Sequence, residues 1–142
     1  MSVSQFSEEV TINTSPERIF ALYEDVSNWN RWDPDVASSS ITGPFIAGTN
    51  GKLKPAKGPE ARIGIVSVEK NKSFTVQSKL PFCTIIIEHE LLPVENATRV
   101  THRVSFNGPL SFFFGRVVGG QIRKGLPGTL RGLKQVIESN VV

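Results

Sequence analysis

The final third of the chain has an apolar stripe at helical spacing. Seven residues recur at steps of three or four, which places them on one face of an α-helix: Phe114, Val118, Ile122, Leu126, Leu130, Leu133 and Ile137. From Gly108 onward the same stretch also contains seven glycines and Pro127. Each interior glycine costs about 1 kcal/mol of helix propensity relative to alanine, and proline about 3 kcal/mol. The sequence therefore predicts a long helix that is held by what it packs against, with a kink at Leu126–Pro127.

Most of the chain before this helix alternates polar and apolar residues, which is the pattern of β-strands. We predict strands over residues 6–13, 36–42, 48–54, 60–69, 74–80, 82–92 and 98–106. In residues 60–69, Ile63 and Ile65 are out of phase with Val66 and Val68. A β-bulge would explain this change of parity.

Two short helices are predicted between the first two strands. The first begins at Thr14 or at Ser15, and in the second case Pro16 takes the first helical position. The second carries Trp29 and Trp32. The element order predicts an α+β fold with a curved antiparallel sheet wrapped around the C-terminal helix, in one domain over residues 1–142. Because one helix cannot fill such a sheet, we expect a cavity between the two.

Composition excludes several classes of protein. The chain has 142 residues, of which 39% are hydrophobic and 20% charged, as in soluble globular proteins. No apolar run approaches the roughly 20 residues of a membrane span, and no signal peptide is visible. The lone Cys83 cannot form an internal disulfide, fits a reducing compartment and indicates a cytoplasmic protein. We read Cys83 as an inert buried thiol, and we expect neither a metal nor a cofactor.

Two histidines are predicted to face the interior. His89 and His102 each share the parity of the apolar residues on their own strand. If Glu95 and Asn96 form a two-residue hairpin tip, the histidines lie directly opposite each other, with Cβ atoms about 5 Å apart. A register shifted by two residues would place them on a diagonal instead. They are either polar groups lining a partly wet interior, or a ligand anchor or an acid/base pair.

The carboxylates near these histidines are predicted to point elsewhere. Glu88 and Glu90 have the outward parity, and we expect them to pair across the hairpin with Arg99 and Arg103. Glu8 has the inward parity of the first strand, at its open end.

Charge is distributed unevenly along the chain. Residues 1–35 contain seven acids and two bases, whereas residues 99–142 contain seven bases and one acid. The basic residues of the final helix are a solvated face, or a surface for a phospholipid headgroup, RNA or an acidic partner. They are Arg116, Arg123, Lys124, Arg131 and Lys134. The net charge of +3 makes nucleic acid a poor candidate.

Three consecutive aromatics, Phe112 to Phe114, surround the start of the final helix. They cannot all face one way. They pack against neighbouring loops, or form an apolar gate or a tip that touches a membrane.

Several motifs together resemble a known family. They are residues 15–20, 25–29, 32–34, 89–91, 98–102, 106–110 and 125–127. They resemble the START-like SRPBCC superfamily, in its polyketide cyclase/dehydrase branch. The resemblance implies a helix-grip fold with a deep cavity for an apolar or aromatic molecule. Some members of that superfamily cyclise or dehydrate polyketides, others bind or carry lipids, hormones or quinones, and none of their catalytic residues is universal.

Our leading hypothesis is a binding protein for a small, mostly apolar or aromatic ligand, such as a lipid, a quinone or a polyketide. The ligand-lining residues are predicted to be Trp32, Phe74, Val76, Ile87, His89, His102, Val104, Phe114, Val118, Ile122 and Leu126. Residues from Leu130 to Ile137 should seal the core. One alternative is a cyclase or dehydratase that uses His89 or His102 as general acid or base. Another is an interaction or chaperone module that uses the basic helix face, with peripheral membrane contact. The sequence does not specify an oligomeric state.

Overall fold

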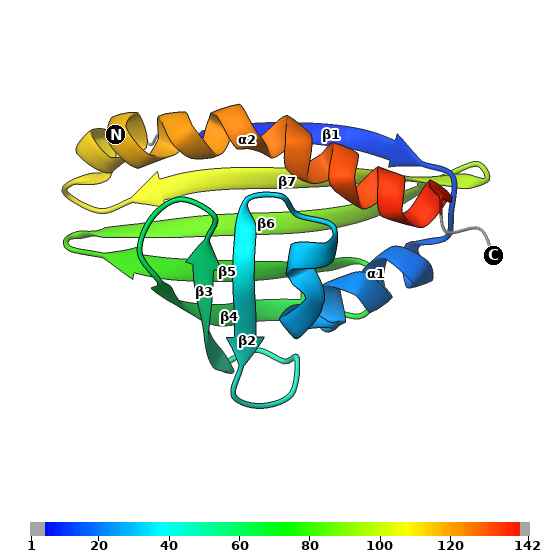
Figure 1. The fold of residues 1–142 in the computed structure, drawn as a ribbon, viewed down its shortest axis with the longest axis horizontal. Helices are drawn as coiled ribbons and strands as arrows, with labels where there is room; N and C mark the ends of the chain where they lie inside the picture. The colour runs from blue at the N-terminus through cyan, green and yellow to red at the C-terminus, as the bar shows by residue number, and fades with distance from the viewer. Residues whose placement is uncertain (1–4, 140–142) are drawn as a thin grey trace.

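The computed structural model describes residues 5–139, which form one antiparallel sheet and three helical segments (Figure 1). The strands are β1 (Gln5–Ile12), β2 (Val36–Ile41), β3 (Asn50–Pro55), β4 (Ala61–Glu69), β5 (Ser73–Leu80), β6 (Cys83–Val94) and β7 (Ala97–Asn107). The helical segments are α1 (Pro16–Glu24), the 3₁₀ helix η1 (Val26–Arg31) and α2 (Ser111–Ser139).

The sheet has the strand order β1-β7-β6-β5-β4-β3-β2, and its neighbouring strands are antiparallel. It curls around α2, which lies along β1 and β7, while α1 and η1 lie on the same face beside the C-terminal half of α2 (Figure 1). This arrangement confirms the expected α+β helix-grip fold. Strand ends fall close to the predicted positions, although β3 begins at Asn50 rather than at residue 48.

The parity change in β4 is a β-bulge, as the alternation of its residues suggested. The register against β5 shifts between Ile65 and Ser67. Ile63 and Ile65 are buried, whereas Val66 is exposed. The bulge therefore changes which side chains of the second half of the strand face inward, while Ile63 and Ile65 of the first half stay buried.

The start of α1 resolves the two alternatives left by the sequence. Ser15 is the N-cap residue and Pro16 is the first helical residue, so a start at Thr14 is wrong. The Ser15 side chain makes no capping hydrogen bond. The fixed φ of proline, together with burial of the inward face of α1, is what favours a helix beginning here.

The β6–β7 hairpin has the predicted register. Val94 pairs with Ala97 and His89 pairs directly with His102. The backbone of the tip differs from expectation, because Glu95 and not Asn96 has a positive φ, of 56°. A two-residue connection between long paired strands requires such a conformation, and the hairpin imposes it despite residue preference.

Helix α2 runs without interruption through Pro127. Its glycines allow close approach at one position in particular. A Cβ on Gly132 would collide with the main-chain oxygen of Trp32. The close contact between the end of η1 and α2 thus depends on the absence of a side chain at Gly132.

No helix in residues 5–139 is long and apolar enough to cross a membrane.

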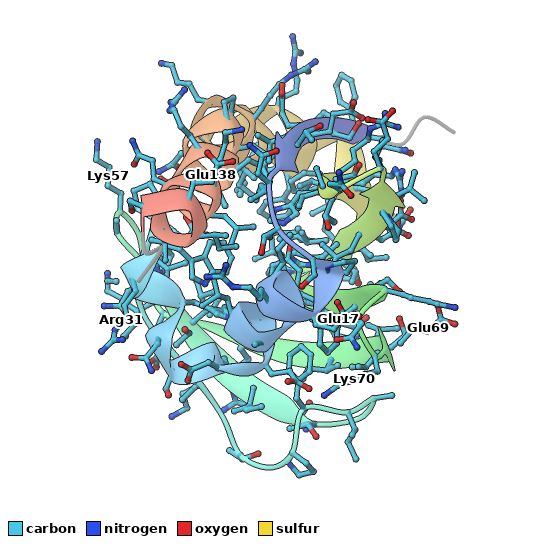
Figure 2. All side chains as sticks on the ribbon, turned by 90° about the vertical axis from the view of Figure 1, so that its right-hand side faces the viewer. Glu17, Arg31, Lys57, Glu69, Lys70 and Glu138 are labelled. Carbon is cyan, nitrogen blue, oxygen red and sulfur yellow. The ribbon has the colours of Figure 1, made fainter. Side chains whose placement is uncertain are left out.

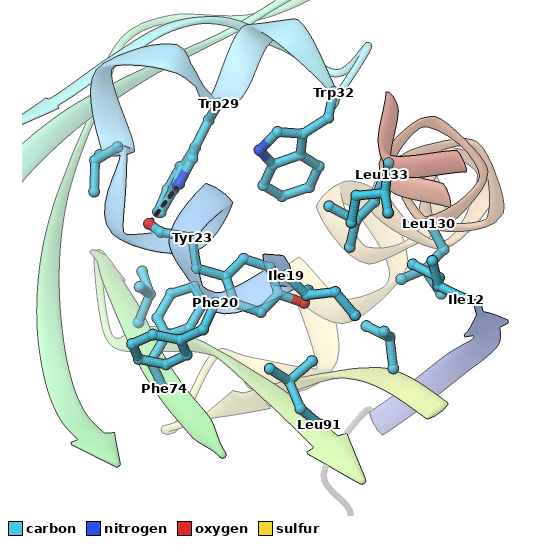
Figure 3. Close-up of a cluster of buried hydrophobic side chains, with 14 of the residues drawn as sticks. Ile12, Ile19, Phe20, Tyr23, Trp29, Trp32, Phe74, Leu91, Leu130 and Leu133 are labelled. Carbon is cyan, nitrogen blue, oxygen red and sulfur yellow. Dashed lines mark hydrogen bonds between the residues drawn. The ribbon is translucent and has the colours of Figure 1, made fainter. Parts of the chain in front are cut away.

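The core consists of two clusters. The first, which we call the closed cluster, joins α1, η1, the sheet and the C-terminal half of α2 (Figure 3). It includes Phe20, Tyr23, Trp29, Trp32, Phe74, Leu91, Leu130, Leu133 and Ile137. The second lies under the N-terminal half of α2 and combines buried with partly exposed side chains. Its buried members are Cys83, Ile85, Val104, Phe106 and Leu126.

Candidate functional site

The apolar stripe of α2 is buried in one half and partly exposed in the other. Leu130, Leu133 and Ile137 are at most 4% exposed, which confirms that they seal the core. Phe114, Val118 and Ile122 face the sheet yet keep partial exposure. The helix therefore contacts the sheet completely only toward its C-terminal end.

Strand β6 shows the same incomplete contact at one position. Ile85 and His89 are buried, but Ile87, which lies between them on the same face, is partly exposed. It packs in the same cluster as the partly exposed residues of α2. We call these partly exposed apolar residues the open cluster; they are Phe6, Leu80, Ile87, Phe114, Val118 and Ile122.

The residues predicted to line a ligand site fall into three groups in the structure. Ile87, Phe114, Val118 and Ile122 belong to the open cluster, with Val104 and Leu126 buried beside them. Trp32, Phe74 and Val76 belong to the closed cluster. His89 and His102 are buried and pack against Tyr23.

Two surface hollows of about 330 and 350 Å³ lie away from all of these residues. The first lies between the β4–β5 turn and the β6–β7 hairpin, and the second beside η1 and the turn after β2. Neither is lined by a predicted ligand residue.

The two histidines form a buried polar pair. Their ring centroids are 4.5 Å apart, and Nε2 of His102 lies 2.8 Å from the Tyr23 hydroxyl oxygen. His89 stacks on the Phe74 ring, with centroids 3.9 Å apart and planes inclined by 7°. Nδ1 of His89 lies 3.2 Å from the Phe74 carbonyl oxygen. Because a carbonyl oxygen only accepts, Nδ1 carries the proton and donates it to this bond.

Burial keeps this pair uncharged. Desolvation lowers the pKa of His89 to about 4, against the hydrogen bond to Phe74, which raises it. Desolvation, with a smaller repulsion from His89, holds the pKa of His102 well below 6.5. Burial also raises the pKa of Tyr23. At neutral pH the three side chains are uncharged; Tyr23 and His102 hydrogen-bond to each other, and His89 hydrogen-bonds to the Phe74 carbonyl oxygen.

Tyr23 is the member of this arrangement that the sequence reasoning placed only as a buried helix residue. A buried tyrosine hydroxyl normally finds a polar partner. The candidate partners were His89 and His102, because both are polar and have inward parity on neighbouring strands of the sheet. A tyrosine on the buried face of a helix and an inward histidine on the sheet could have predicted the hydrogen bond between Tyr23 and His102.

The charged residues of the hairpin lie on the outer face, but one predicted pairing is wrong. Arg103 pairs with Glu88 at 2.7 Å and with Glu90 at 3.3 Å. Arg99 does not join them; its nearest carboxylate is Glu9, at 3.9 Å across the β1–β7 pair. Strand β1 pairs with β7 on the side away from β6, and this neighbour cannot be deduced from the hairpin sequence alone. The two exposed ion pairs on Arg103 contribute little stability each.

Glu8 lies beside His102 in the β1–β7 register. Its parity is therefore the predicted inward one. Its side chain is nonetheless exposed. Position at the sheet edge explains this, because β1 is the last strand on that side.

The basic face of α2 is already in use at three positions. The Arg123 guanidinium lies 5.4 Å from the centroid of the Phe6 ring. The Lys134 ammonium donates to the Thr11 carbonyl oxygen at 2.7 Å and pairs with Glu138. Arg116 lies over Phe112. Much of the basic face thus packs on its own molecule.

Two polar groups beside α2 have unusual surroundings. Burial raises the pKa of Asp33 to about 6, against hydrogen bonds from the Asp35 amide and the Thr129 hydroxyl, both 2.9 Å long. The Trp32 side chain is buried, at 5% exposure, and its Nε1 has no hydrogen-bond partner. Among the deeply buried side-chain nitrogens and oxygens of residues 5–139 it is the one without a partner. By contrast, Nε1 of Trp29 donates to the Tyr23 carbonyl oxygen (Figure 3).

The remaining candidate residues give no indication of a reactive thiol or of a metal site. Cys83 is buried, and desolvation raises the pKa of its thiol, which opposes formation of a thiolate. Within the described part of the chain, no three His, Cys, Asp or Glu side chains gather closely enough to bind a metal ion.

Comparison with solved structures shows the same fold in proteins of low sequence identity. A Mesorhizobium loti protein superposes with a TM-score of 0.80 at 16% identity, covering 97% of this chain and 99% of its own. The Zhui aromatase/cyclase from Streptomyces sp. R1128 gives 0.81 at 10% identity, with 99% and 97% covered. Norcoclaurine synthase from Thalictrum flavum, in complex with dopamine and hydroxybenzaldehyde, gives 0.76 at 12% identity, with 99% and 90% covered.

No curated protein matches the sequence. A family model does match, over residues 4–138, and its description is polyketide cyclase/dehydrase and lipid transport. Together with the helix-grip neighbours, this match supports a ligand-binding or cyclase role. The chain therefore belongs to the polyketide cyclase/dehydrase and lipid transport family.

Proposed function

We propose that the protein binds a small, mostly apolar or aromatic molecule between the N-terminal half of α2 and the sheet. The observation that carries this proposal is the open cluster, in which Ile87 and Ile122 face the interior from opposing elements yet stay partly exposed. A ligand covering these side chains removes apolar surface from water, worth about 25 cal/mol per Å². The core residues around them have little apolar surface left for a ligand to cover, since they are already buried.

Neither of the two surface hollows lies at the open cluster, and we propose that α2 moves to admit a ligand there. The helix is weak where this motion is needed: Gly115, Gly119 and Gly120 lie between Phe114 and Ile122. A segment with few buried contacts and poor helix propensity opens locally at low cost. We therefore assign the N-terminal half of α2 the role of a lid.

Trp32 supplies a polar feature for the same proposal. An unmet buried N–H costs about 1–3 kcal/mol, which a ligand oxygen would recover. Because Trp32 belongs to the closed cluster, we propose that the ligand extends from the open cluster toward it and carries a hydrogen-bond acceptor for Nε1, such as a carbonyl oxygen. Aromatic ligands have support from the neighbours, since the norcoclaurine synthase structure holds dopamine and hydroxybenzaldehyde.

The binding site can be tested by filling it. Val118→Trp places a large side chain in the open cluster, whereas Val117→Trp places the same side chain at an adjacent, exposed position. In isothermal titration calorimetry with 1-tetralone, we expect Val118→Trp to weaken binding at least about tenfold and Val117→Trp to leave it unchanged. Equal binding by both variants and the unaltered protein would contradict the proposed location.

The role of Trp32 needs a separate comparison. 1-Tetralone and tetralin share a ring skeleton and differ in one carbonyl oxygen. We expect the ketone to bind about 5-fold to 100-fold more tightly, the value of a hydrogen bond to an otherwise unmet donor, and Trp32→Phe to remove that difference. With only two tryptophans in the chain, the indole N–H signals in a ¹⁵N spectrum are easily assigned, and the Trp32 signal should move on ketone binding. A Trp32 signal that stays in place, or equal affinities for the two probes, would refute the acceptor.

Catalysis by the histidines has less support from the geometry. His102 is engaged by Tyr23 and His89 by Phe74, so both rings already have hydrogen-bond partners, unlike Nε1 of Trp32. A general base must reach the proton that it removes. We therefore favour a structural role for the pair and propose binding, in a reducing compartment such as the cytoplasm, as the activity.

A further inference from the structure

Exposed apolar side chains gather at one end of the molecule. Among the described residues eight large hydrophobic side chains are exposed, and five come from two segments, the β5–β6 turn and the start of α2. We call these five the aromatic tip; they are Phe82, Leu110, Phe112, Phe113 and Val117. Figure 1 shows both segments at the left-hand end.

The two segments form one surface. The Leu110 amide donates to the Phe82 carbonyl oxygen at 3.0 Å, so the turn and the beginning of α2 are tied together. Phe82 is 73% exposed and Phe112 is 65% exposed. The other exposed large hydrophobic residues lie in other segments: Ile46 in the loop after β2, Val66 on β4 and Leu92 on β6.

Phe82 stands at a position that favours a different residue. Its φ is +56°, in the left-handed region, where glycine or asparagine is stable and a bulky side chain is strained. An exposed phenylalanine gains nothing there from the fold of its own chain. The two-residue turn between the paired residues Leu80 and Cys83 imposes this φ, as the β6–β7 hairpin does at Glu95, and it holds the Phe82 ring out into solvent.

The charges around the tip have one sign. Residues 79–84 and 108–117 contain Lys79 and Arg116 and no carboxylate. The Arg116 guanidinium lies 5.3 Å from the centroid of the Phe112 ring, so that charge sits beside the apolar surface. The opposite end of the molecule differs, because Figure 2 shows Glu17, Arg31, Glu69, Lys70 and Glu138 there, with both signs of charge.

From this combination we infer that the aromatic tip inserts into the surface of an anionic phospholipid membrane. Aromatic and aliphatic side chains enter the boundary between headgroups and acyl chains, and basic side chains beside them pair with anionic headgroups. The tip adjoins Phe114 of the open cluster along α2. A membrane contact here would hold the proposed lid against the bilayer, and the inference extends the proposed function to that surface.

Vesicle co-sedimentation tests this inference. With vesicles of phosphatidylcholine and phosphatidylglycerol, we expect the unaltered protein to bind and the double variant Phe112→Ser/Phe113→Ser to bind at least about tenfold more weakly. The matched control is Val66→Ser/Leu92→Ser, which removes two exposed apolar side chains from other elements and should bind like the unaltered protein. Arg116→Gln should weaken binding about fivefold on the anionic vesicles and leave binding to phosphatidylcholine alone unchanged.

Three results would overturn the inference. One is absence of binding to anionic vesicles, and another is equal loss in the control variant. The third is a concentration-dependent dimer, found by sedimentation velocity, that the Phe112→Ser/Phe113→Ser variant abolishes while the protein ignores vesicles; the tip would then contact a second copy. Since neither Phe112 nor Phe113 belongs to the open cluster, 1-tetralone binding should persist in that variant. Failure of membrane binding and failure of ligand binding are thus separate results.

Discussion

The two halves of α2 share one stripe and one fold but have different roles. In the C-terminal half, Leu130 and Leu133 are buried against α1, η1 and the sheet. In the N-terminal half, Val118 and Ile122 continue the stripe over the sheet and remain partly exposed. Apolar residues recur at helical spacing in both halves, so the difference comes from what faces them.

What faces the C-terminal half is an aromatic layer. Tyr23, Trp29 and Trp32 fill the space between η1, α1 and the sheet, and the helix closes over them (Figure 3). Under the N-terminal half, the described residues that face the helix come from the sheet. The C-terminal half is therefore anchored in the core, and we propose that the N-terminal half acts as a lid.

The largest expected contrast is in stability. Leu133→Ala removes a fully buried side chain, and we expect it to lower the free energy of unfolding by about 3 kcal/mol. Ile122→Ala removes a side chain that still contacts water, and we expect a loss below about 1.5 kcal/mol. Urea denaturation of the two variants measures both, and equal losses would break the distinction between the halves.

The buried histidines of the closed cluster should make stability depend on pH. Their folded pKa values lie below the unfolded value near 6.5, so the unfolded chain binds more protons as the pH falls. Their contribution is therefore complete above pH 6.5 and is lost as the pH falls from about 6.5 to 4, by about 3 kcal/mol for His89 alone. Denaturant midpoints across this range test it, and His89→Phe, which keeps a ring stacked on Phe74, should flatten the decline. A midpoint independent of pH would show that the pair is hydrated.

Glycine substitutions sharpen the comparison further. Gly132→Ala adds a methyl group against the Trp32 carbonyl oxygen, and we expect a loss of about 1–2 kcal/mol despite the better helix propensity. At Gly120 an added Cβ meets no atom within 4 Å, so Gly120→Ala should stabilise by about 0.5–1 kcal/mol. Thermal unfolding measures both. If Gly132→Ala also stabilises, the close contact between η1 and α2 is not required.

An effect similar in size to that of Gly120→Ala is expected at Asp33, which bonds to Thr129 in the anchored half. Its folded pKa of about 6 lies above the unfolded value of 3.8, so its charged form opposes folding above pH 6. Asp33→Asn keeps an oxygen acceptor for Thr129 and should raise stability by about 1 kcal/mol at pH 7, with no gain below about pH 4. A variant that is less stable at pH 7 would show that Asp33 is favourable in its charged form.

Local pattern was sufficient to predict much of the fold and part of the site. The period of two in β6 and β7, with a two-residue tip, predicts that His89 faces His102, because a shift by one residue would expose every apolar side chain. The stripe on α2 predicts which face is inward. Both are properties of a single hairpin or a single helix.

Other features depend on contacts that no local pattern contains. The bond between Tyr23 and His102 joins residues 79 positions apart, and the pairing of Arg99 with Glu9 depends on β1 lying beside β7. The missing partner of Trp32 Nε1 is likewise a result of packing between η1 and α2. The positive φ at Glu95 shows hairpin geometry overriding residue preference.

The most direct test of the two-half account is to locate a bound probe by nuclear Overhauser effects. With methyl-labelled protein and 1-tetralone, the account predicts contacts from the probe to the methyl groups of Ile87, Val118 and Ile122. It predicts none to Leu130, Leu133 or Ile137. Contacts to the C-terminal half, or a probe that contacts only exposed methyl groups such as those of Val117, would contradict it.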